Sequence, residues 1–561
     1  MKLLSTGKTT LIVISLVLVS FALGAFGDSS PRRDKTDIYH DLEIFAGVIE
    51  KVQSYYVDEV DTHDLVREAI DGMLSKLDPH SQFLADLEYE DLMVSTRGEF
   101  GGLGIFISFR DNYPTVISAI DDTPAYRAGI RGGDQIIEIE GMATEGWAVD
   151  RAVGYLRGDP GTTVNFKISR PGSRDALEYA ITREIINVKS VPYYDTFDDG
   201  VGYIKVGSFS KHTSQELEDA LLDLEARGMK KLVLDFRMNP GGLLQAATEV
   251  SEMFLDKDKL LVFTKGRLPN ANRKYYSSNR KIHGGYPIVV MINAHSASAS
   301  EIFAGAMQDW DAALVVGQTS FGKGTVQTVF NLSETEAVKL TTAKYYTPSG
   351  RSIHKDHPTD EEEDAQYAAM SEGGEEYPAP LEEMQGGDDE TGKPEQAAKV
   401  EQKKDEEKPV YYTSGGRMVT GGGGITPDLE LQPREYTDLQ RRLERETVAF
   451  SFVVEYFTAH DYGDQWKVTD QVLEEFYKYL DTREFKYEKD ELTEENVAYI
   501  RTMLAREAAN NQAGRRAAYR VVTEDDPEFQ HVLGIMDSAR SLTDLFAYAE
   551  QQKGIKKASA D

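Results

Sequence analysis

The sequence predicts a multidomain protein with an α/β fold in its central part. The chain has 561 residues, which is too long for a single hydrophobic core, because such cores rarely exceed about 250–300 residues. Residues 187–357 alternate apolar strand segments with amphipathic helices, as layered α/β architectures do. Short strands dominate residues 96–186, and helical periodicity is found near both ends of the chain.

The central region should contain strands and helices in turn. Residues 288–292 are apolar throughout, as expected for a strand that is covered on both faces. The expected strands are 201–206, 232–237, 288–292, 313–316 and 325–330, and the expected helices are 214–227, 243–254 and 298–310.

The flanking regions have other patterns. Residues 37–95 are predicted to form an N-terminal helical region, and residues 433–561 a C-terminal helical region with segments near 439–457, 469–479 and 494–512. Residues 359–408 carry about 18 acidic and about 5 basic side chains and few large apolar ones, which predicts an acidic disordered insertion. Because the core pattern resumes over 409–432, this insertion is expected to lie within the core region.

The N-terminus has the features of an export signal. Lys2 and Lys8 precede an apolar run over residues 11–26 that ends in small residues. Residues 1–30 are therefore predicted to be a signal peptide or an N-terminal membrane anchor, with residues 9–26 as the segment that would lie in the inner membrane. The expected location is the periplasm or cell envelope. The chain has no cysteine, which excludes disulfides and thiolate metal sites.

The composition argues against several classes of function. A net charge of −33 disfavours nucleic-acid binding, since phosphate backbones require basic surface. No His-Glu-x-x-His string or comparable cluster is present, and no metal or other cofactor is expected. Residues 317–323 match the phosphate-loop pattern Gly-x-x-x-x-Gly-Lys, but Gly324 follows where a serine or threonine would bind magnesium. The residues after it alternate like a strand, so nucleotide binding is also disfavoured.

Ser298 and Lys323 are the strongest candidates for chemistry. Ser298 stands where the expected strand 288–292 turns into a helix, whose first N–H groups point at the same spot. Lys323 lies in a glycine-flanked bend, where partial burial would favour the neutral amine that can accept the serine's proton. Taken separately, each residue is better explained without chemistry, Ser298 as a helix cap and Lys323 as a solvated surface charge.

Other groups could complete this site. The N–H of Ala299 is well placed to stabilise an oxyanion, and a second donor could come from the turn Asn239-Pro240-Gly241-Gly242. Gln327 follows Lys323 by four residues in an expected strand, so its amide would share a face with the lysine and could orient it. His295 is an alternative base, although a residue so close to the nucleophile in sequence would often point away from it.

Within residues 96–186, a Gly-Gly-Leu-Gly-Ile loop at 101–105 is followed by an expected strand at 116–120, a short helix at 123–130 and an alternating strand at 133–141. In this order, these features resemble a PDZ domain of the bacterial, protease-associated kind. In such a domain the N–H groups of Gly102, Leu103, Gly104 and Ile105 hold a peptide's terminal carboxylate, and the adjoining strand edge accepts the peptide. A glycine-rich hairpin without a ligand is the alternative.

Taken together, the motifs resemble those of the carboxyl-terminal processing peptidases, or tail-specific proteases. The shared strings are Asp-Phe-Arg-Met-Asn-Pro-Gly-Gly, Ser-Ala-Ser-Ala-Ser-Glu-Ile, Thr-Ser-Phe-Gly-Lys-Gly-Thr-Val-Gln, Pro-Ser-Gly-Arg-Ser-Ile and Gly-Gly-Gly-Gly-Ile-Thr-Pro-Asp, over roughly residues 40–357 and 410–432. The resemblance implies a crotonase-like layered α/β serine peptidase core with an inserted PDZ domain. It also implies Ser298 as nucleophile, Lys323 as general base, Gln327 as orienting amide, and Ala299 and Gly241 as oxyanion donors, with Gly242 the near alternative.

The resemblance implies an exported serine endopeptidase that binds the C-termini of substrate proteins or peptides and cleaves them through an acyl-enzyme. The alternative is a binding protein, in which a PDZ receptor sits on an inactive hydrolase frame. Fragments of an unstructured protein that form only when the serine is intact would distinguish the two.

Overall fold

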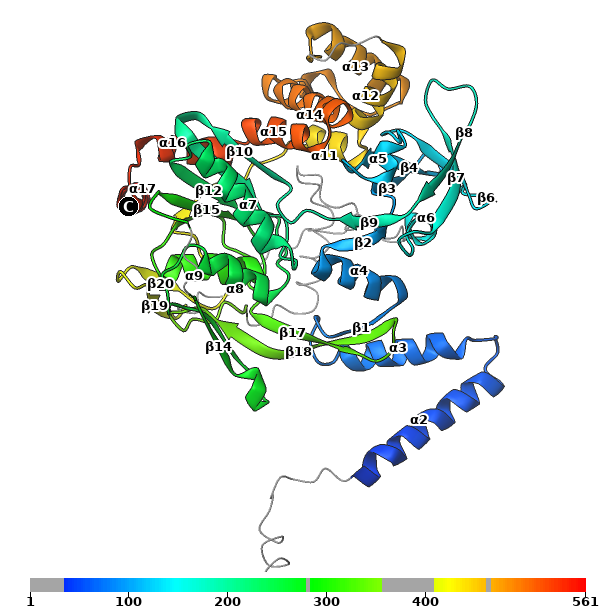
Figure 1. Cartoon of the computed structure of the whole chain (residues 1–561), viewed down its shortest axis with the longest axis horizontal. Coiled ribbons are helices and arrows are strands. Elements are labelled where there is room, and N and C mark those ends of the chain that lie inside the picture. Colours follow the sequence, from blue (N-terminus) through cyan, green and yellow to red (C-terminus); the bar gives the residue numbers. More distant parts are fainter. Residues whose placement is uncertain (1–34, 279–282, 356–407, 461–465, 561) are drawn as a thin grey trace, which may run out of the picture. The chain divides into compact units, whose positions relative to one another are not determined.

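The computed structural model describes residues 35–278, 283–355, 408–460 and 466–560 of the chain (Figure 1). The chain divides into two compact units, Met1–Asp78 and Pro79–Asp561. The predicted export signal at residues 1–30 and nearly all of the acidic insertion lie outside the described residues. Across the described ranges, we found no helix with the length and apolar character needed to cross a membrane.

The first unit contains two helices, α2 (Lys35–Tyr55) and α3 (Thr62–Leu74). Asp61 caps α3 by accepting a hydrogen bond from the N–H of His63. Helices were expected in this part of the sequence, and helices are found.

A six-stranded sheet lies at the centre of the second unit. Its strands, in spatial order, are β10 (Tyr193–Phe197), β11 (Val201–Lys205), β12 (Lys231–Asp235), β15 (Ile288–Ile292), β16 (Leu314–Gly317) and β21 (Leu429–Glu430). All neighbours are parallel except β10 and β11. The strand β21 shows that the chain returns to this sheet after the acidic insertion.

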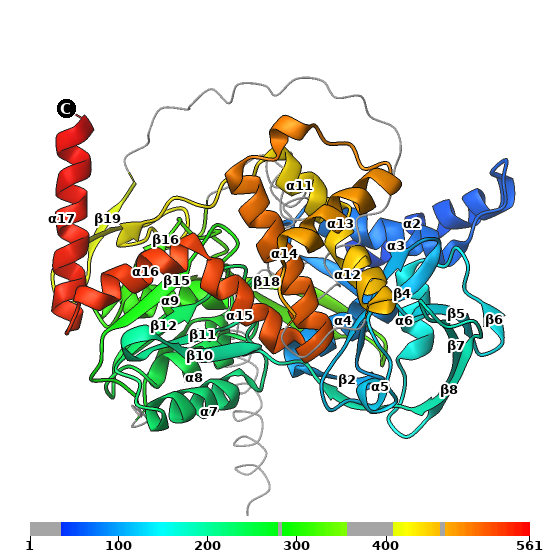
Figure 2. The same cartoon turned by 90° about the horizontal axis from the view of Figure 1, so that it is seen from above.

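Helices cover both faces of this sheet. On one face, α7 (Thr213–Ala226), α8 (Leu244–Glu252) and α9 (Ala299–Asp309) enclose the largest apolar core. On the other face, the second core includes side chains from α15 (Arg515–Asp525), α16 (Pro527–Ser538) and α17 (Leu542–Ala560). In Figure 2, strands β10 to β12 lie between α15 and α16 on one side and α7 and α8 on the other. The last helices of the chain therefore complete the central α/β layers.

The packing of α16 on the sheet can be tested by replacing Phe529. Its side chain is fully buried, and its ring lies 4.8 Å from that of Tyr203 and 4.9 Å from that of Phe197, measured between centroids. Phe529→Ala is expected to lower the free energy of unfolding by about 3–5 kcal/mol, measured by denaturant titration. Phe330→Ala, at a position with 47% exposure, is the matched control and should change it little. A Phe529→Ala chain as stable as this control would contradict the packing.

A second, antiparallel sheet adjoins the central one. It contains β1 (Gln82–Ala85), β18 (Glu336–Tyr346), β13 (Leu260–Lys265) and β14 (Arg273–Tyr276) in that order, with β17 (Thr325–Asn331) also paired to β18. The prediction that residues 37–95 are helical is wrong at β1, which lies between α3 and α4 (Asp86–Arg97). β1 is a strand because it pairs with β18, some 250 residues further along the chain.

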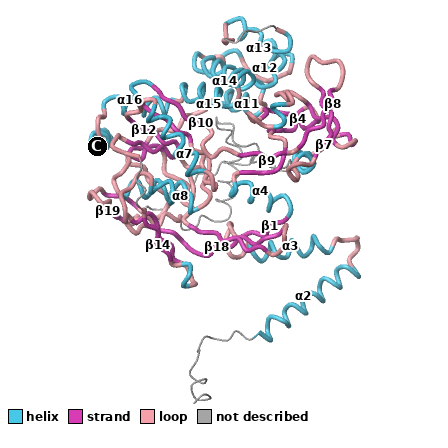
Figure 3. Tube along the Cα trace, viewed as in Figure 1, coloured by secondary structure: helices cyan, strands magenta, loops and turns pink. Residues whose placement is uncertain are grey.

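The region from Glu99 to Asn187 is built mainly of strands (Figure 3). One sheet has the order β3 (Ile105–Arg110), β4 (Tyr113–Ala119), β5 (Gln135–Ile139), β7 (Thr163–Ser169) and β8 (Leu177–Thr182), with β6 (Met142–Ala143) paired to β5. Helices α5 (Pro124–Arg127) and α6 (Val149–Leu156) pack on it, and β2 (Glu99–Gly102) pairs with β9 (Glu184–Asn187). β3 is an edge strand of its sheet, which leaves one side of its backbone available for an added strand.

Residues 438–513 form a helical subdomain with its own core. Its helices are α11 (Asp438–Arg445), α12 (Val448–Ala459), α13 (Asp470–Thr482) and α14 (Glu494–Ala513). The single segment predicted over 439–457 is two helices, because Thr447 adopts a left-handed conformation with φ 46° and ends the first one. α12 faces the β4–β5 loop, where a side chain at Gly133 would collide with Val454.

Candidate active site

Ser298 occupies a strained turn between β15 and α9. Its φ of 51° is unusual for a serine, and its side chain is partly exposed. The flanking serines attach this turn to the segment that follows β12: Ser296 Oγ donates to the carbonyl of Phe236 at 2.8 Å, and Ser300 Oγ to that of Asn239 at 3.0 Å. The turn therefore presents Ser298 at the carboxyl edge of the central sheet, beside the start of a buried helix.

The glycine pair after Pro240 lies against this turn. A Cβ placed on Gly241 would lie 2.8 Å from the nitrogen of Ala299 and 2.8 Å from Cβ of Ser298, so the close approach requires glycine. The N–H of Gly241 donates to Oδ1 of Asn239 at 2.9 Å. Within the described part of the chain the N–H of Gly242 makes no hydrogen bond, which keeps Gly242 as the alternative oxyanion donor.

Glu301 connects the serine turn to the lysine loop. One carboxylate oxygen accepts hydrogen bonds from Ser320 Oγ at 2.5 Å and from the N–H of Gly322 at 2.8 Å. The other accepts from the N–H of Ser298 at 2.8 Å and from the N–H of Lys323 at 3.0 Å. This fully buried carboxylate holds the backbones of the two candidate residues together, and no role for it is predicted from the sequence.

Tyr345 makes the second connection between these segments. Its hydroxyl donates towards the carbonyl of Ser298 at 3.0 Å and also contacts that of Lys323. Burial, together with the nearby Glu301, raises the pKa of Tyr345 well above its usual value, so it stays a neutral donor. The structure thus brings the backbones of Ser298 and Lys323 together.

The pairing of β17 is irregular beside Gln327. Lys323 precedes β17, which begins at Thr325, and a register shift occurs between Val326 and Gln327. Simple alternation along one strand therefore does not place Gln327 on the face of Lys323. The side-chain nitrogen of Gln327 donates to the hydroxyls of Thr325 at 2.9 Å and Thr341 at 3.3 Å.

The two alternative readings of this region find little support. No helix follows Lys323, since β17 begins two residues later, so the structural context of a phosphate loop is missing. The N–H of His295 donates to Oδ1 of Asn293 within the same turn. His295 also lines a cavity of about 170 Å³ together with Met238 and Gln318.

Burial raises the pKa of Glu301 to about 7, although its four donors act in the opposite direction. In the unfolded chain the Glu301 carboxyl loses its proton as the pH rises through 4.5, whereas in the folded chain it keeps the proton up to about pH 7. Between these two pH values the folded chain therefore binds more protons than the unfolded chain. The contribution of Glu301 to stability should therefore be greatest below pH 4.5 and be lost as the pH rises through 7. We expect Glu301→Gln to remove this component from a plot of unfolding free energy against pH. An unchanged slope between pH 5 and 7 in this variant would contradict the assignment.

The Gly-Leu-Gly-Ile loop joins β2 to β3. Gly104 has φ 79°, and its carbonyl accepts hydrogen bonds from Thr123 Oγ1 at 3.2 Å and from the N–H of Ile120 at 2.8 Å. The carbonyl of Leu103 accepts from the N–H of Ala125 at 3.0 Å. The carbonyls thus face inwards, and in the described residues the N–H groups of Leu103 and Gly104 make no hydrogen bond. This is the arrangement that a carboxylate-binding loop needs.

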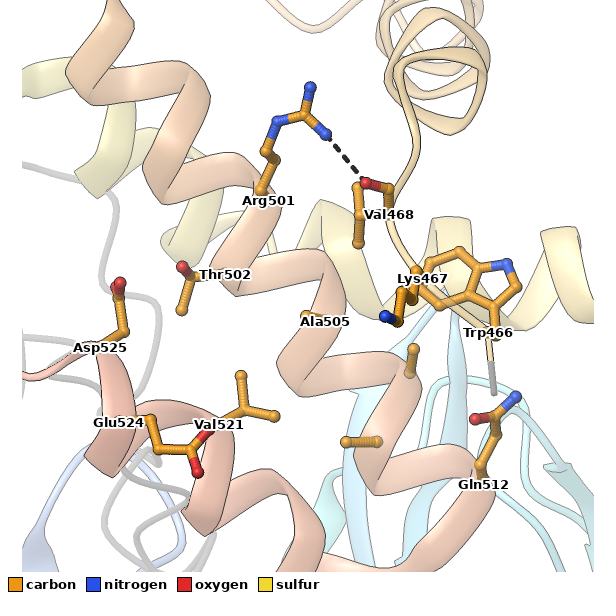
Figure 4. A pocket seen from close by; sticks show the side chains of 12 residues that line it. Trp466, Lys467, Val468, Arg501, Thr502, Ala505, Gln512, Val521, Glu524 and Asp525 are labelled. Carbon is orange, nitrogen blue, oxygen red and sulfur yellow. Dashed lines mark hydrogen bonds between the residues drawn. The ribbon is translucent and has the colours of Figure 1, made fainter. Parts of the chain in front are cut away.

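A larger pocket, of about 470 Å³, lies in the C-terminal helices (Figure 4). Trp466 and Lys467 form one side of it, and Val521 and Glu524 of α15 the other. Arg501, also at this pocket, donates to the carbonyl of Val468 at 2.8 Å. None of the predicted site residues lines it.

Known proteins match the chain over the regions just described. The model of peptidase family S41 matches residues 200–362, and a PDZ-domain model matches residues 115–170. The carboxy-terminal-processing protease of Bartonella bacilliformis is 40% identical over 350 residues, which is 62% of this chain and 80% of that protein. The carboxy-terminal processing protease CtpB of Bacillus subtilis is 36% identical over 60% of this chain and 69% of that protein.

Among solved structures, a photosystem II D1 C-terminal processing protease is 28% identical and covers 56% of this chain and 90% of that chain, with a TM-score of 0.32. The family match rests on the sequence relatives, and the matched segment includes the serine turn, the diglycine turn and the lysine loop. The chain therefore belongs to peptidase family S41 and is a carboxy-terminal processing serine protease with a PDZ domain.

Proposed function

We propose that this protease cleaves peptide bonds with Ser298 as nucleophile and Lys323 as general base. Ser298 Oγ attacks the scissile carbonyl carbon, and its proton passes to the neutral amine of Lys323. The carbonyl oxygen becomes an oxyanion that faces the N–H of Ala299 and that of Gly241 or Gly242. When the C–N bond breaks, Lys323 gives the proton to the leaving amine. Water then attacks the acyl carbon while Lys323 accepts its proton, and Lys323 passes that proton to Ser298 Oγ as the acyl C–O bond breaks.

The observation that carries this proposal is the hydrogen bonding of Glu301. One buried carboxylate accepts from the N–H groups of both Ser298 and Lys323, at 2.8 and 3.0 Å. Capping of α9 requires only the bond to the N–H of Ser298, and the bonds to Gly322 and Lys323 are additional. The arrangement supports a serine and a lysine that act as one site. We propose that the side-chain amide of Gln327 orients Lys323.

Three backbone N–H groups are candidates for the two oxyanion donors. The N–H of Ala299 is the first of α9 and has no partner within the helix. The N–H of Gly241 would have to leave Asn239 in order to bind an oxyanion, whereas that of Gly242 would not. The N–H of Ala299 is kept as one donor. Gly241 is kept as the second donor, and Gly242 is the alternative whose N–H has no hydrogen bond to break within the described residues.

We further propose that the PDZ domain selects substrates by their free C-terminal carboxylate. The loop from Gly102 to Ile105 would bind the carboxylate, and the edge of β3 would pair with the preceding residues. Substrates would be proteins or peptides with accessible C-termini.

The PDZ proposal predicts a preference that can be measured with matched substrates. An unstructured peptide with a free C-terminus should be cleaved with a kcat/KM at least about 10-fold higher than the same peptide with an amidated C-terminus, because the amide lacks the charge that the loop N–H groups bind. Both peptides should give no fragments with Ser298→Ala. Equal cleavage of the two forms would refute selection by the carboxylate.

We also propose that the chain acts in the cell envelope, either free in the periplasm or anchored through residues 9–26. The support is the charged and apolar pattern of residues 1–30. Recovery of the full-length protein in the cytosolic fraction of a bacterial cell would contradict this location.

A further inference from the structure

The C-terminal helices contribute a charged residue to the neighbourhood of the active site. Asp526 lies between α15 and α16 and is 7% exposed. Its Oδ1 caps α16, since it accepts from the N–H groups of Glu528 at 2.9 Å and Phe529 at 3.3 Å. Its Oδ2 is paired with Nη2 of Arg237. The carboxylate of Asp526 thus caps α16 with one oxygen and pairs with Arg237 through the other.

Arg237 lies at the beginning of the segment that leads to the glycine pair. It is 6% exposed and also binds Asp235, with Nη2 2.7 Å from Oδ2. Its carbonyl accepts a hydrogen bond from Lys205 Nζ at 2.6 Å. Glu528 adds a weaker contact at 3.5 Å from Nη1. The side chain and the main chain of Arg237 are therefore both held by buried charged groups.

The residues after Arg237 form the diglycine turn, which contacts the turn that carries Ser298. Met238 has φ 59°, and its N–H donates to Oδ1 of Asn293 at 3.0 Å. The carbonyl of Asn239 accepts from the N–H of Ala297 at 3.0 Å and from Ser300 Oγ at 3.0 Å. A shift of Arg237 would consequently move Met238 and Asn239, and through them the turn that carries Ser298.

The charges in this buried cluster depend on one another. Burial alone would raise the pKa of Asp235, but Arg237 and Lys205 hold it well below its usual range. Burial also lowers the pKa of Lys205 despite the adjacent Asp235. Asp235 contacts both cations, and Asp526 provides the second close carboxylate for Arg237. Without Asp526, the buried guanidinium of Arg237 would lose its second close carboxylate and would be expected to reorient.

We propose that Asp526 is a positioning residue of the catalytic site, which holds Arg237, and thereby the diglycine turn, in the orientation that oxyanion binding requires. The proposal rests on the roles proposed above for Ser298 and the diglycine turn. It assigns the C-terminal helices a part in catalysis as well as in packing.

The test compares Asp526→Asn with Asp526→Glu in the full chain. Asparagine remains a good helix cap but loses the charge, whereas glutamate keeps the charge but caps poorly. Each variant is assayed for kcat and KM on an unstructured peptide, for the maximal rate at which a fluorophosphonate labels the serine, and for Tm. In Asp526→Asn, kcat and the labelling rate should fall about 10- to 100-fold, with KM changed less than about twofold, because a displaced oxyanion donor weakens transition-state binding. Asp526→Glu should be the more active variant and the less stable one.

The control is Glu524→Gln, in the last turn of α15. Glu524 also binds an arginine, Arg520, at 2.8 Å, but both side chains are about half exposed. This control should keep the wild-type kcat. A wild-type kcat in Asp526→Asn would overturn the proposal. So would losses of activity that run parallel to the losses of Tm in all variants, because Asp526 would then have only a structural role. An Asp526→Asn chain that does not fold counts as this second result. Activity that persists in Ser298→Ala would instead overturn the proposed function.

Discussion

Replacing Ser298 by alanine is expected to abolish proteolysis and to leave the fold intact. The substitution removes only the hydroxyl that attacks the substrate, and loss of a serine nucleophile costs about 10⁶-fold in kcat in a serine protease where it has been measured. The side chain is partly exposed, and the turn is held by Ser296, Ser300 and Glu301 through bonds that do not involve Ser298 Oγ. The measurement is the appearance of fragments from an unstructured protein, with Tm recorded beside it.

A neighbouring serine provides the control for this experiment. Ser300→Ala removes a buried hydroxyl that donates to the carbonyl of Asn239, so it should slow the enzyme by loosening the turn but should not abolish cleavage. Fragments that persist in purified Ser298→Ala would remove the proposed mechanism.

Replacing Lys323 should have the second-largest effect. Lys323→Ala leaves Ser298 without a proton acceptor, and we expect kcat to fall by about 10³- to 10⁴-fold at neutral pH. Lys323→Arg should be equally inactive, because arginine keeps the positive charge but does not release its proton. If Lys323 were only a surface charge, Lys323→Arg would keep the wild-type kcat.

The same assay distinguishes the lysine from a histidine base. The rate–pH profile of His295→Ala should retain the shape of the wild type, since the ring of His295 has no part in the proposed proton transfer. An acid limb that disappears in His295→Ala while Lys323→Arg stays active would contradict the dyad and favour a serine–histidine site.

The sequence was most informative where local pattern decides structure. The strand 288–292 and the helix predicted at 298–310 are found as β15 and α9, because an apolar run and a helical segment that begins at a capping serine can be recognised without a distant partner. Tertiary pairing was not predictable in the same way. β1 depends on β18, and the left-handed Thr447 divides a continuous helical pattern into two helices.

Glu301 shows the same limit at the site. Ser-x-x-Glu at 298–301 is a recognisable capping-box pattern, and the Glu301 carboxylate does accept from the N–H of Ser298. The bonds to Ser320, Gly322 and Lys323 come from a loop about twenty residues further on, and no local pattern indicates them. Asp526 is more distant still, since nothing in the C-terminal sequence points to Arg237.

The proposed dyad is tested most directly by locating the reactive residue in the full-length protein. A fluorophosphonate is allowed to react at neutral pH with the wild type, Lys323→Ala and Lys323→Arg, and the adduct is mapped by peptide mass spectrometry. The mechanism predicts an adduct on Ser298 alone in the wild type and none, over the same time, in either lysine variant. An adduct on another residue, or labelling of Ser298 at the wild-type rate without Lys323, would contradict it.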